Sequence, residues 1–295
     1  MHRLLLIALA GLIASCAEDP ARLMTWDDLE SRPRPQPTET LRYRDGDAGL
    51  IDVWLPDGPG PHPVVVMIHG GCWQKEIADR TLMNYAAEAL RNRGLAVWNI
   101  EYRGVDEPGG GYPGTFTDVA AAVDALRDAP ERFKLSPQIV VAYGHSAGGH
   151  LAVWAATRGN LPEDSPLWSP DPHPIDVVVN AGGLADIAVS AVTTSPSCLA
   201  DIRTQLVGDR PDALRDTSPA ELLPPRSIVY NVNGARDGIA PPELGEAFTD
   251  AINSAAGAST FRLMADAGHV ELIAPGTPAF EVQAQIIAAH AFAGN

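Results

Sequence analysis

The feature that most constrains the fold of this chain is a series of short, strongly apolar segments rich in β-branched residues. Five of them lie at residues 64–68, 95–100, 139–142, 177–179 and 228–232. Such segments are typical of strands buried on both faces, which occur in mainly parallel sheets covered by helices. Residues 50–55 instead alternate apolar and polar side chains, which predicts a half-buried strand.

Helical patterns separate these predicted strands. Apolar residues recur with helical spacing over residues 82–90 and 116–126. We expect the first helix to stop at Gly94, and Thr115 or Thr117 to cap the second. Because strands and helices alternate, the sequence predicts one α/β domain over residues 41–295, with a mostly parallel central sheet and helices on both faces.

Composition excludes several classes of protein. The 295 residues are 45% hydrophobic and 20% charged, which is typical of a globular protein rather than a disordered chain or a multi-span membrane protein. The net charge of −16 opposes binding to nucleic acid. The three cysteines form no CxxC pair, and no spacing of histidines and carboxylates suggests a metal site. No metal and no other cofactor is expected.

The N-terminus has the pattern of an export signal. A basic start is followed by an apolar stretch over residues 4–13, too short to span a bilayer, and then by small residues. Residues 13–16 resemble the lipobox of bacterial lipoproteins, which implies a signal peptide over residues 1–15 and lipidation of Cys16. The alternative is an ordinary secretory signal with an incidental cysteine. By the same resemblance, Ala17 favours the outer membrane, on the periplasmic side of the cell envelope. Residues 16–40 are then predicted to be a tether.

A candidate nucleophile follows the apolar segment at residues 139–142. Gly144, Ser146 and Gly148 form a Gly-x-Ser-x-Gly pattern between a predicted strand and a predicted helix. In a nucleophile elbow, this sharp turn strains the central residue and exposes its hydroxyl at the N-terminus of the helix. The alternative is a glycine-rich turn without chemistry.

A second glycine-rich motif, HGGCW at residues 69–73, follows another predicted strand. Together with GHSAGGH at residues 144–150, it resembles the α/β-hydrolase superfamily, in the branch of esterases, lipases and kynurenine-formamidase-like enzymes. The resemblance implies an oxyanion hole built from backbone N–H groups of Gly71, Cys72 and Ala147, with Gly70 as the alternative loop donor. It also implies that residues 101–103 brace this loop, and His69 is expected to support the loop rather than to act as a base.

A Ser-His-Asp triad needs a base and an acid that follow the nucleophile in chain order in this fold. His269 lies in a glycine-bounded loop after a predicted strand at residues 260–264, and we expect it to be the base. The other downstream histidines, His150, His173 and His290, lie in a helix, a proline-rich stretch and a C-terminal helix. Asp237 follows the predicted strand at residues 228–232 and is the favoured acid, with two alternatives, Asp266 and Asp186.

These motifs predict a serine hydrolase. The favoured activity is that of a carboxylesterase, which would act on neutral short-chain esters through an acyl-enzyme. The motifs leave open an arylformamidase, amidase or peptidase, and also a non-catalytic binding protein of the same fold. The expected partners are a small-molecule ester as substrate and a membrane, which the protein would contact through a lipid anchor at Cys16. Trp73, with the small side chains of Ala147 and Cys72, suggests a modest acyl pocket. The oligomeric state is not predicted.

Two further features stay open in the sequence. Residues 183–225 are hard to assign, and in relatives this region often forms a cap-like insertion over the active site. Cys72 and Cys198 are either two free thiols or a disulfide that ties this region to the oxyanion loop.

Overall fold

The computed structural model describes residues 22–193, 198 and 202–294. The predicted signal peptide, the lipidation site at Cys16 and the first part of the predicted tether lie outside the described residues. The strands are β1 (Glu39–Arg42), β2 (Leu50–Trp54), β3 (His62–Ile68), β4 (Ala96–Ile100), β5 (Leu135–His145), β6 (Val177–Ala181), β7 (Ile228–Gly234) and β8 (Ala258–Met264). The α-helices are α1 (Trp26–Glu30), α2 (Asn84–Arg91), α3 (Gly114–Asp124), α4 (Pro130–Phe133), α5 (Ala147–Thr157), α6 (Ile187–Thr193), α7 (Arg203–Val207), α8 (Pro242–Ser254) and α9 (Pro278–Ala291).

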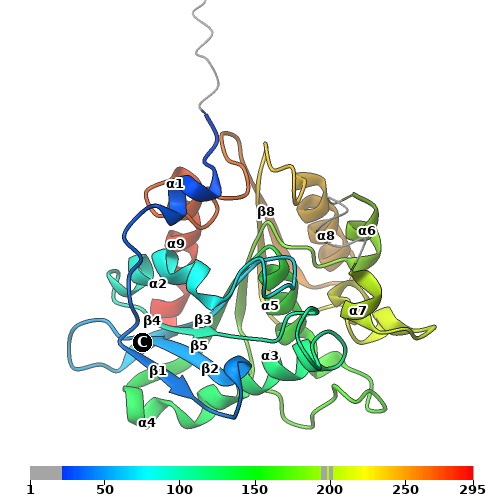
Figure 1. Ribbon diagram of the computed structural model, residues 1–295, viewed down its shortest axis with the longest axis horizontal. Coiled ribbons are helices and arrows are strands. Elements are labelled where there is room, and N and C mark those ends of the chain that lie inside the picture. The colour runs from blue at the N-terminus through cyan, green and yellow to red at the C-terminus, as the bar shows by residue number, and fades with distance from the viewer. Residues whose placement is uncertain (1–21, 194–197, 199–201, 295) are drawn as a thin grey trace, which may run out of the picture.

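These strands form one eight-stranded sheet in the order β1-β2-β4-β3-β5-β6-β7-β8 (Figure 1). The pairs β1–β2 and β2–β4 are antiparallel, and every other neighbouring pair is parallel. This confirms the predicted α/β-hydrolase architecture. The short edge strand β1 was not predicted, because residues 39–42 lack an apolar run and are mostly exposed.

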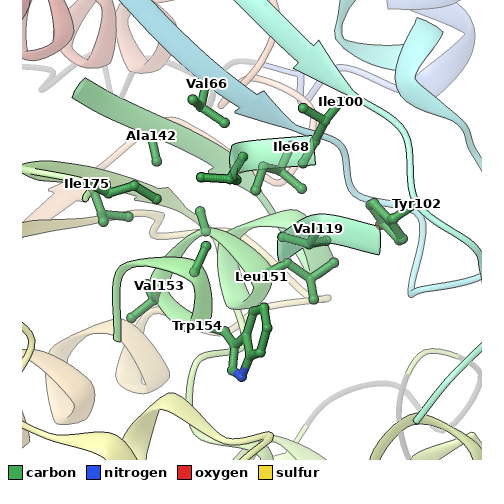
Figure 2. Packing of buried hydrophobic residues seen from close by; sticks show 14 of the residues in the cluster. Val66, Ile68, Ile100, Tyr102, Val119, Ala142, Leu151, Val153, Trp154 and Ile175 are labelled. Carbon is green, nitrogen blue, oxygen red and sulfur yellow. The ribbon is translucent and has the colours of Figure 1, made fainter. Parts of the chain in front are cut away.

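Helices cover the two faces of the sheet and bury two apolar clusters. Helices α3, α5 and α8 pack on one face, and helices α2 and α9 pack on the other. Figure 2 shows part of the first cluster, where Val66 and Ala142 of the sheet meet Val119 of α3 and Leu151 of α5. The predicted side-chain cap of α3 is wrong. Pro113 occupies the N-cap, and the Thr115 hydroxyl instead donates to the carbonyl oxygen of Arg103.

The described part of the N-terminal segment does not form a free tether. Residues 22–36, which we call the N-terminal strap, pack on the domain and contain helix α1, closed by a capping box between Thr25 and Asp28. Leu29 is fully buried in the apolar cluster of α2 and α9. From residue 22 onward the predicted tether of residues 16–40 instead packs on the domain, because Leu29 is buried and hydrogen bonds to distant residues hold the segment. Across the described ranges, no helix is both long and apolar enough to cross a membrane.

Candidate active site

Ser146 lies at the junction of β5 and α5 in a strained backbone conformation. Its φ of 55° and ψ of −121° are unusual for a residue other than glycine. The flanking glycines make this turn feasible. A Cβ on Gly144 would approach the carbonyl oxygen of Gly148 to 2.2 Å, and a Cβ on Gly148 would approach that of Ile68 to 2.2 Å. The serine side chain therefore stands at the N-terminus of α5, where the helix dipole favours negative charge.

His269 and Asp237 meet across the end of the sheet. The Nδ1 atom of His269 lies 2.6 Å from Oδ2 of Asp237, and both side chains are buried. The other carboxylate oxygen of Asp237 accepts hydrogen bonds from the backbone N–H groups of Ile239 and Ala240, at 2.8 and 2.9 Å. These two bonds fix the carboxylate, so that Oδ2 points at the imidazole.

The alternative acids do not occupy this position. The side chain of Asp186 accepts hydrogen bonds from the backbone N–H groups of Ala188 and Val189, and so caps the start of α6. Asp266 is exposed on the loop before His269. The structure thus brings only Asp237 of the three candidates to the imidazole.

His145, which the sequence analysis did not single out, supports the loop of His269. Its Nε2 atom lies 3.1 Å from the backbone oxygen of His269, and the two rings are 4.4 Å apart. Because a carbonyl oxygen only accepts, Nε2 of His145 must carry the proton. Burial lowers the pKa of His145 well below its usual value, so that this ring is neutral beside His269.

Ser146 and His269 line the same cavity, which has a volume of about 140 Å³. Within the described chain, no hydrogen bond joins the two side chains; contacts of this kind often form only when substrate is bound. The wall of the cavity is mainly apolar and is formed by Trp26, Glu30, Gly71, Cys72, Ile77, Ala78, Leu82, His145, Ser146, Ile239 and His269.

The loop after β3 has an unusual backbone beside Ser146. Gly71, Cys72 and Trp73 all have positive φ angles, of 103°, 52° and 55°. In the part of the chain that the structure describes, the backbone N–H groups of Gly71, Cys72 and Ala147 donate to no protein acceptor. An oxyanion hole requires donors that have no protein partner, and two of these residues, Gly71 and Cys72, also line the cavity.

A buried polar cluster supports this loop. The ring nitrogens of His69 face Oε1 of Glu101 at 2.8 Å and the carbonyl oxygen of Gly70 at 2.7 Å, and the His69 ring stacks on Tyr102. The hydroxyl of Tyr102 donates to the carbonyl oxygen of His69. Burial opposes the charge of Glu101, but its pairing with His69 and Lys75 outweighs burial and lowers the pKa of Glu101 to about 2. His69 thus makes its side-chain contacts within this supporting cluster, and it is not among the residues that line the cavity of Ser146.

Cys72 and Cys198 form a disulfide, which ties the loop to residues beyond β6. The predicted role of Trp73 in the pocket is wrong. Its indole is fully buried and donates a hydrogen bond to Nδ1 of His150, at 3.1 Å. The other ring nitrogen of His150 faces the carbonyl oxygen of Thr217, and burial lowers the pKa of His150 to about 4.

The residues that line the cavity also differ from those expected, because the predicted cap is not among them. None of the described residues of the 183–225 region lines the cavity, whereas Trp26 and Glu30 of the N-terminal strap do. Neither residue was predicted to lie at the site, because residues 16–40 were expected to form a tether. The apolar spacing within residues 23–29 indicates that this segment packs on the domain, but it does not indicate that Trp26 faces the cavity. His173 and His290 do not line the cavity. A ring nitrogen of His173 is hydrogen-bonded to the carbonyl oxygen of Pro174, and a ring nitrogen of His290 is hydrogen-bonded to the hydroxyl of Tyr230. Among the described side chains, no group of three or more His, Cys, Asp or Glu is arranged to hold a metal ion.

Comparison with known proteins identifies the family. Residues 51–252 match the BD-FAE family, a span that contains the elbow serine, the loop after β3 and Asp237. The chain belongs to the BD-FAE family. Esterase LipC of Mycobacterium tuberculosis is 28% identical over 225 residues, which cover 72% of this chain and 54% of that protein. The chain thus spans about half the length of the curated relatives that it matches.

Solved structures share the fold of this BD-FAE member. Esterase B from Lactobacillus rhamnosis superposes with a TM-score of 0.78 at 19% identity, covering 91% of this chain and 90% of that one. A propionate-bound esterase, Est2 from Thermogutta terrifontis, gives a TM-score of 0.68 at 18% identity, covering 85% of this chain and 92% of that one. At these identities the likeness concerns the fold, which is that of the α/β-hydrolases.

Proposed function

We propose that this protein is a serine carboxylesterase with Ser146 as nucleophile, His269 as general base and Asp237 as the acid that orients it. The observation that carries the proposal is that Ser146, in its strained elbow, shares one cavity with the imidazole that Asp237 holds at 2.6 Å. Membership of the BD-FAE family and similarity to Esterase LipC support the same activity.

The proposed reaction follows from this geometry. Ser146 Oγ attacks the ester carbonyl carbon while Nε2 of His269 takes its proton. The charge that forms on the carbonyl oxygen is stabilised by the N–H groups of Gly71, Cys72 and Ala147. His269 then returns the proton to the leaving alcohol, and the acyl group remains on Ser146. Water, deprotonated by His269, attacks this acyl-enzyme and releases the acid.

The size of the cavity supports a small substrate group. Its volume of about 140 Å³ is close to that of an engineered apolar cavity, roughly 150 Å³, that binds benzene. A group of that size fits an acetyl or butyryl ester, whereas most of a palmitoyl chain would lie outside. The net charge of −16 opposes the approach of anionic substrates, so neutral esters are favoured. The propionate-bound Est2 is an example of a small acyl group in this fold.

Activity on defined esters tests this proposal. We expect the purified protein to hydrolyse p-nitrophenyl acetate and butyrate at least tenfold faster, in kcat/KM, than the palmitate or an aryl formamide. Ser146→Ala should abolish both this turnover and labelling by a fluorophosphonate probe, and His269→Ala should lower kcat by orders of magnitude. A wild-type protein that neither labels nor turns over esters would instead be a binding protein. Tenfold faster hydrolysis of the formamide or palmitate would contradict the short-ester assignment.

We also propose that the protein is a lipoprotein, anchored at Cys16 to the outer membrane on the periplasmic side. The lipobox-like residues 13–16 support this localisation. Trp26 at the cavity lies ten positions after Cys16 in the chain, so the two residues are at most about 36 Å apart even in an extended chain. The cavity would then lie close to the membrane surface. Mass spectrometry of protein isolated from membranes should find a lipidated Cys16 at the N-terminus. An N-terminus at Ala17 or later would contradict the anchor.

A further inference from the structure

The N-terminal strap is attached directly to the loop that carries His269. The backbone N–H of Met24 donates to Oε1 of Glu271 at 2.5 Å. The other oxygen of Glu271 accepts the backbone N–H of Gly268 at 2.9 Å. Glu271 is buried, so one carboxylate joins the strap to the residue that precedes the imidazole. The strap therefore has a fixed position relative to the base.

More hydrogen bonds hold the strap along its length. Arg32 donates to the carbonyl oxygen of Pro275, and Asn84 of α2 donates to the carbonyl oxygen of Pro35 at 3.0 Å. The hydroxyl of Tyr85 lies within hydrogen-bond distance of the carbonyl oxygens of two strap residues. Together with the fully buried Leu29, these contacts make the strap a part of the domain rather than a loose leader.

This attachment places the indole of Trp26 at the reaction site. The ring lies edge-on to His269, with centroids 6.2 Å apart, and edge-on to His145, at 6.1 Å. Trp26 also lines the cavity that contains Ser146. It is the largest side chain in the wall and comes from outside the span that matches the BD-FAE family, which begins at residue 51.

We propose that Trp26 determines substrate size, because its indole closes one side of the cavity beside Ser146 and His269. This inference rests on the proposed esterase function and adds the residue that limits the ester chain. Removal of the indole opens the cavity along the strap, where longer chains can bury further methylene groups. Each buried methylene is worth roughly fourfold in binding. Room for two more methylene groups therefore shifts the kcat/KM ratio of long to short esters by about tenfold or more.

Two chain-length series test the proposal. The wild type, Trp26→Ala and Trp26→Phe are compared on p-nitrophenyl acetate, butyrate, hexanoate and octanoate, and on acetates of alcohols of increasing length. In one of the two series, Trp26→Ala should raise the kcat/KM ratio of the longest to the shortest ester at least tenfold. The smaller change to Trp26→Phe should give an intermediate shift. Trp168→Ala, which removes a partly exposed tryptophan outside the cavity wall, is the matched control and should leave both ratios unchanged.

The outcomes separate this proposal from the esterase proposal. A wild-type protein without esterase activity or fluorophosphonate labelling would overturn the proposed function itself. An active wild type whose chain-length profiles are unchanged in Trp26→Ala, or fall equally for every ester, would overturn the role of Trp26 alone. If Trp26→Ala does not fold, judged by circular dichroism and thermal unfolding, the folded Trp26→Phe decides: an unchanged profile in both series contradicts the proposal.

Discussion

Replacement of Asp237 by asparagine should remove catalysis while the fold is kept. In the native protein, one oxygen of Asp237 accepts two backbone N–H groups and the other faces Nδ1 of His269 at 2.6 Å. The single amide oxygen of asparagine can keep the two backbone bonds only if its NH₂ group faces the imidazole. A donor at that place requires an unprotonated Nδ1. The proton of a neutral His269 then lies on Nε2, which can no longer accept the proton of Ser146.

The expected magnitude follows from this change of tautomer. The equivalent substitution in a serine protease lowers kcat about 10⁴-fold, equal to about 5 kcal/mol of lost transition-state stabilisation. We therefore expect Asp237→Asn to reduce kcat for p-nitrophenyl butyrate by about 10³- to 10⁴-fold. The thermal midpoint should change little, because both backbone bonds of the carboxylate are retained.

A neighbouring variant controls for the loss of charge. Asp266→Asn removes one carboxylate from the exposed part of the loop before His269 and should leave kcat within twofold of wild type. The assay is stopped-flow or steady-state hydrolysis at pH 7.5, with thermal unfolding measured on the same samples. If Asp237→Asn keeps more than a tenth of the wild-type kcat, the tautomer argument is wrong. An equal loss in Asp266→Asn would show a general effect of charge instead.

Three other changes test the supports of the site. The disulfide joins two cysteines that are 126 positions apart in the sequence, so Cys198→Ser should lower the free energy of unfolding by about 2–5 kcal/mol. Two reactive thiols, from Cys72 and Cys198, in unreduced denatured protein would disprove the bond. The pKa of His150 is lowered from 6.5 to about 4, so the unfolded state binds more protons between these values and stability is lost as pH falls through this window. Between pH 7 and pH 5, urea titration should show a loss about 2 kcal/mol larger in wild type than in His150→Gln, and equal losses would refute the assignment. Gly148→Ala, whose Cβ would lie 2.2 Å from the carbonyl oxygen of Ile68, should lower both the thermal midpoint and kcat, and a variant unchanged in both would contradict the close packing of the elbow.

Local patterns in the sequence were enough to predict the elbow and every strand of the sheet except the edge strand β1. The apolar runs at residues 64–68 and 139–142 fall within β3 and β5, because strands buried on both faces require continuous apolar sequence. The elbow was recognisable because its strained turn needs glycine at fixed positions around Ser146. Asp237 and His269 were chosen from the order of elements, since parallel strands bring their carboxyl ends to one edge of the sheet.

The tertiary structure alone decided what surrounds these residues. No local pattern pairs Cys72 with Cys198, and none indicates that Trp26, rather than Trp73, lines the cavity. Trp73 can be buried because its indole N–H has an acceptor there, Nδ1 of His150, which lies 77 positions later in the chain. Trp26 reaches the cavity because Leu29 and a hydrogen bond to Glu271 hold the strap against distant parts of the chain. The periodicity of apolar residues in the sequence indicates which face of a helix or strand is buried. Contacts between residues far apart in the sequence depend instead on how the whole chain packs.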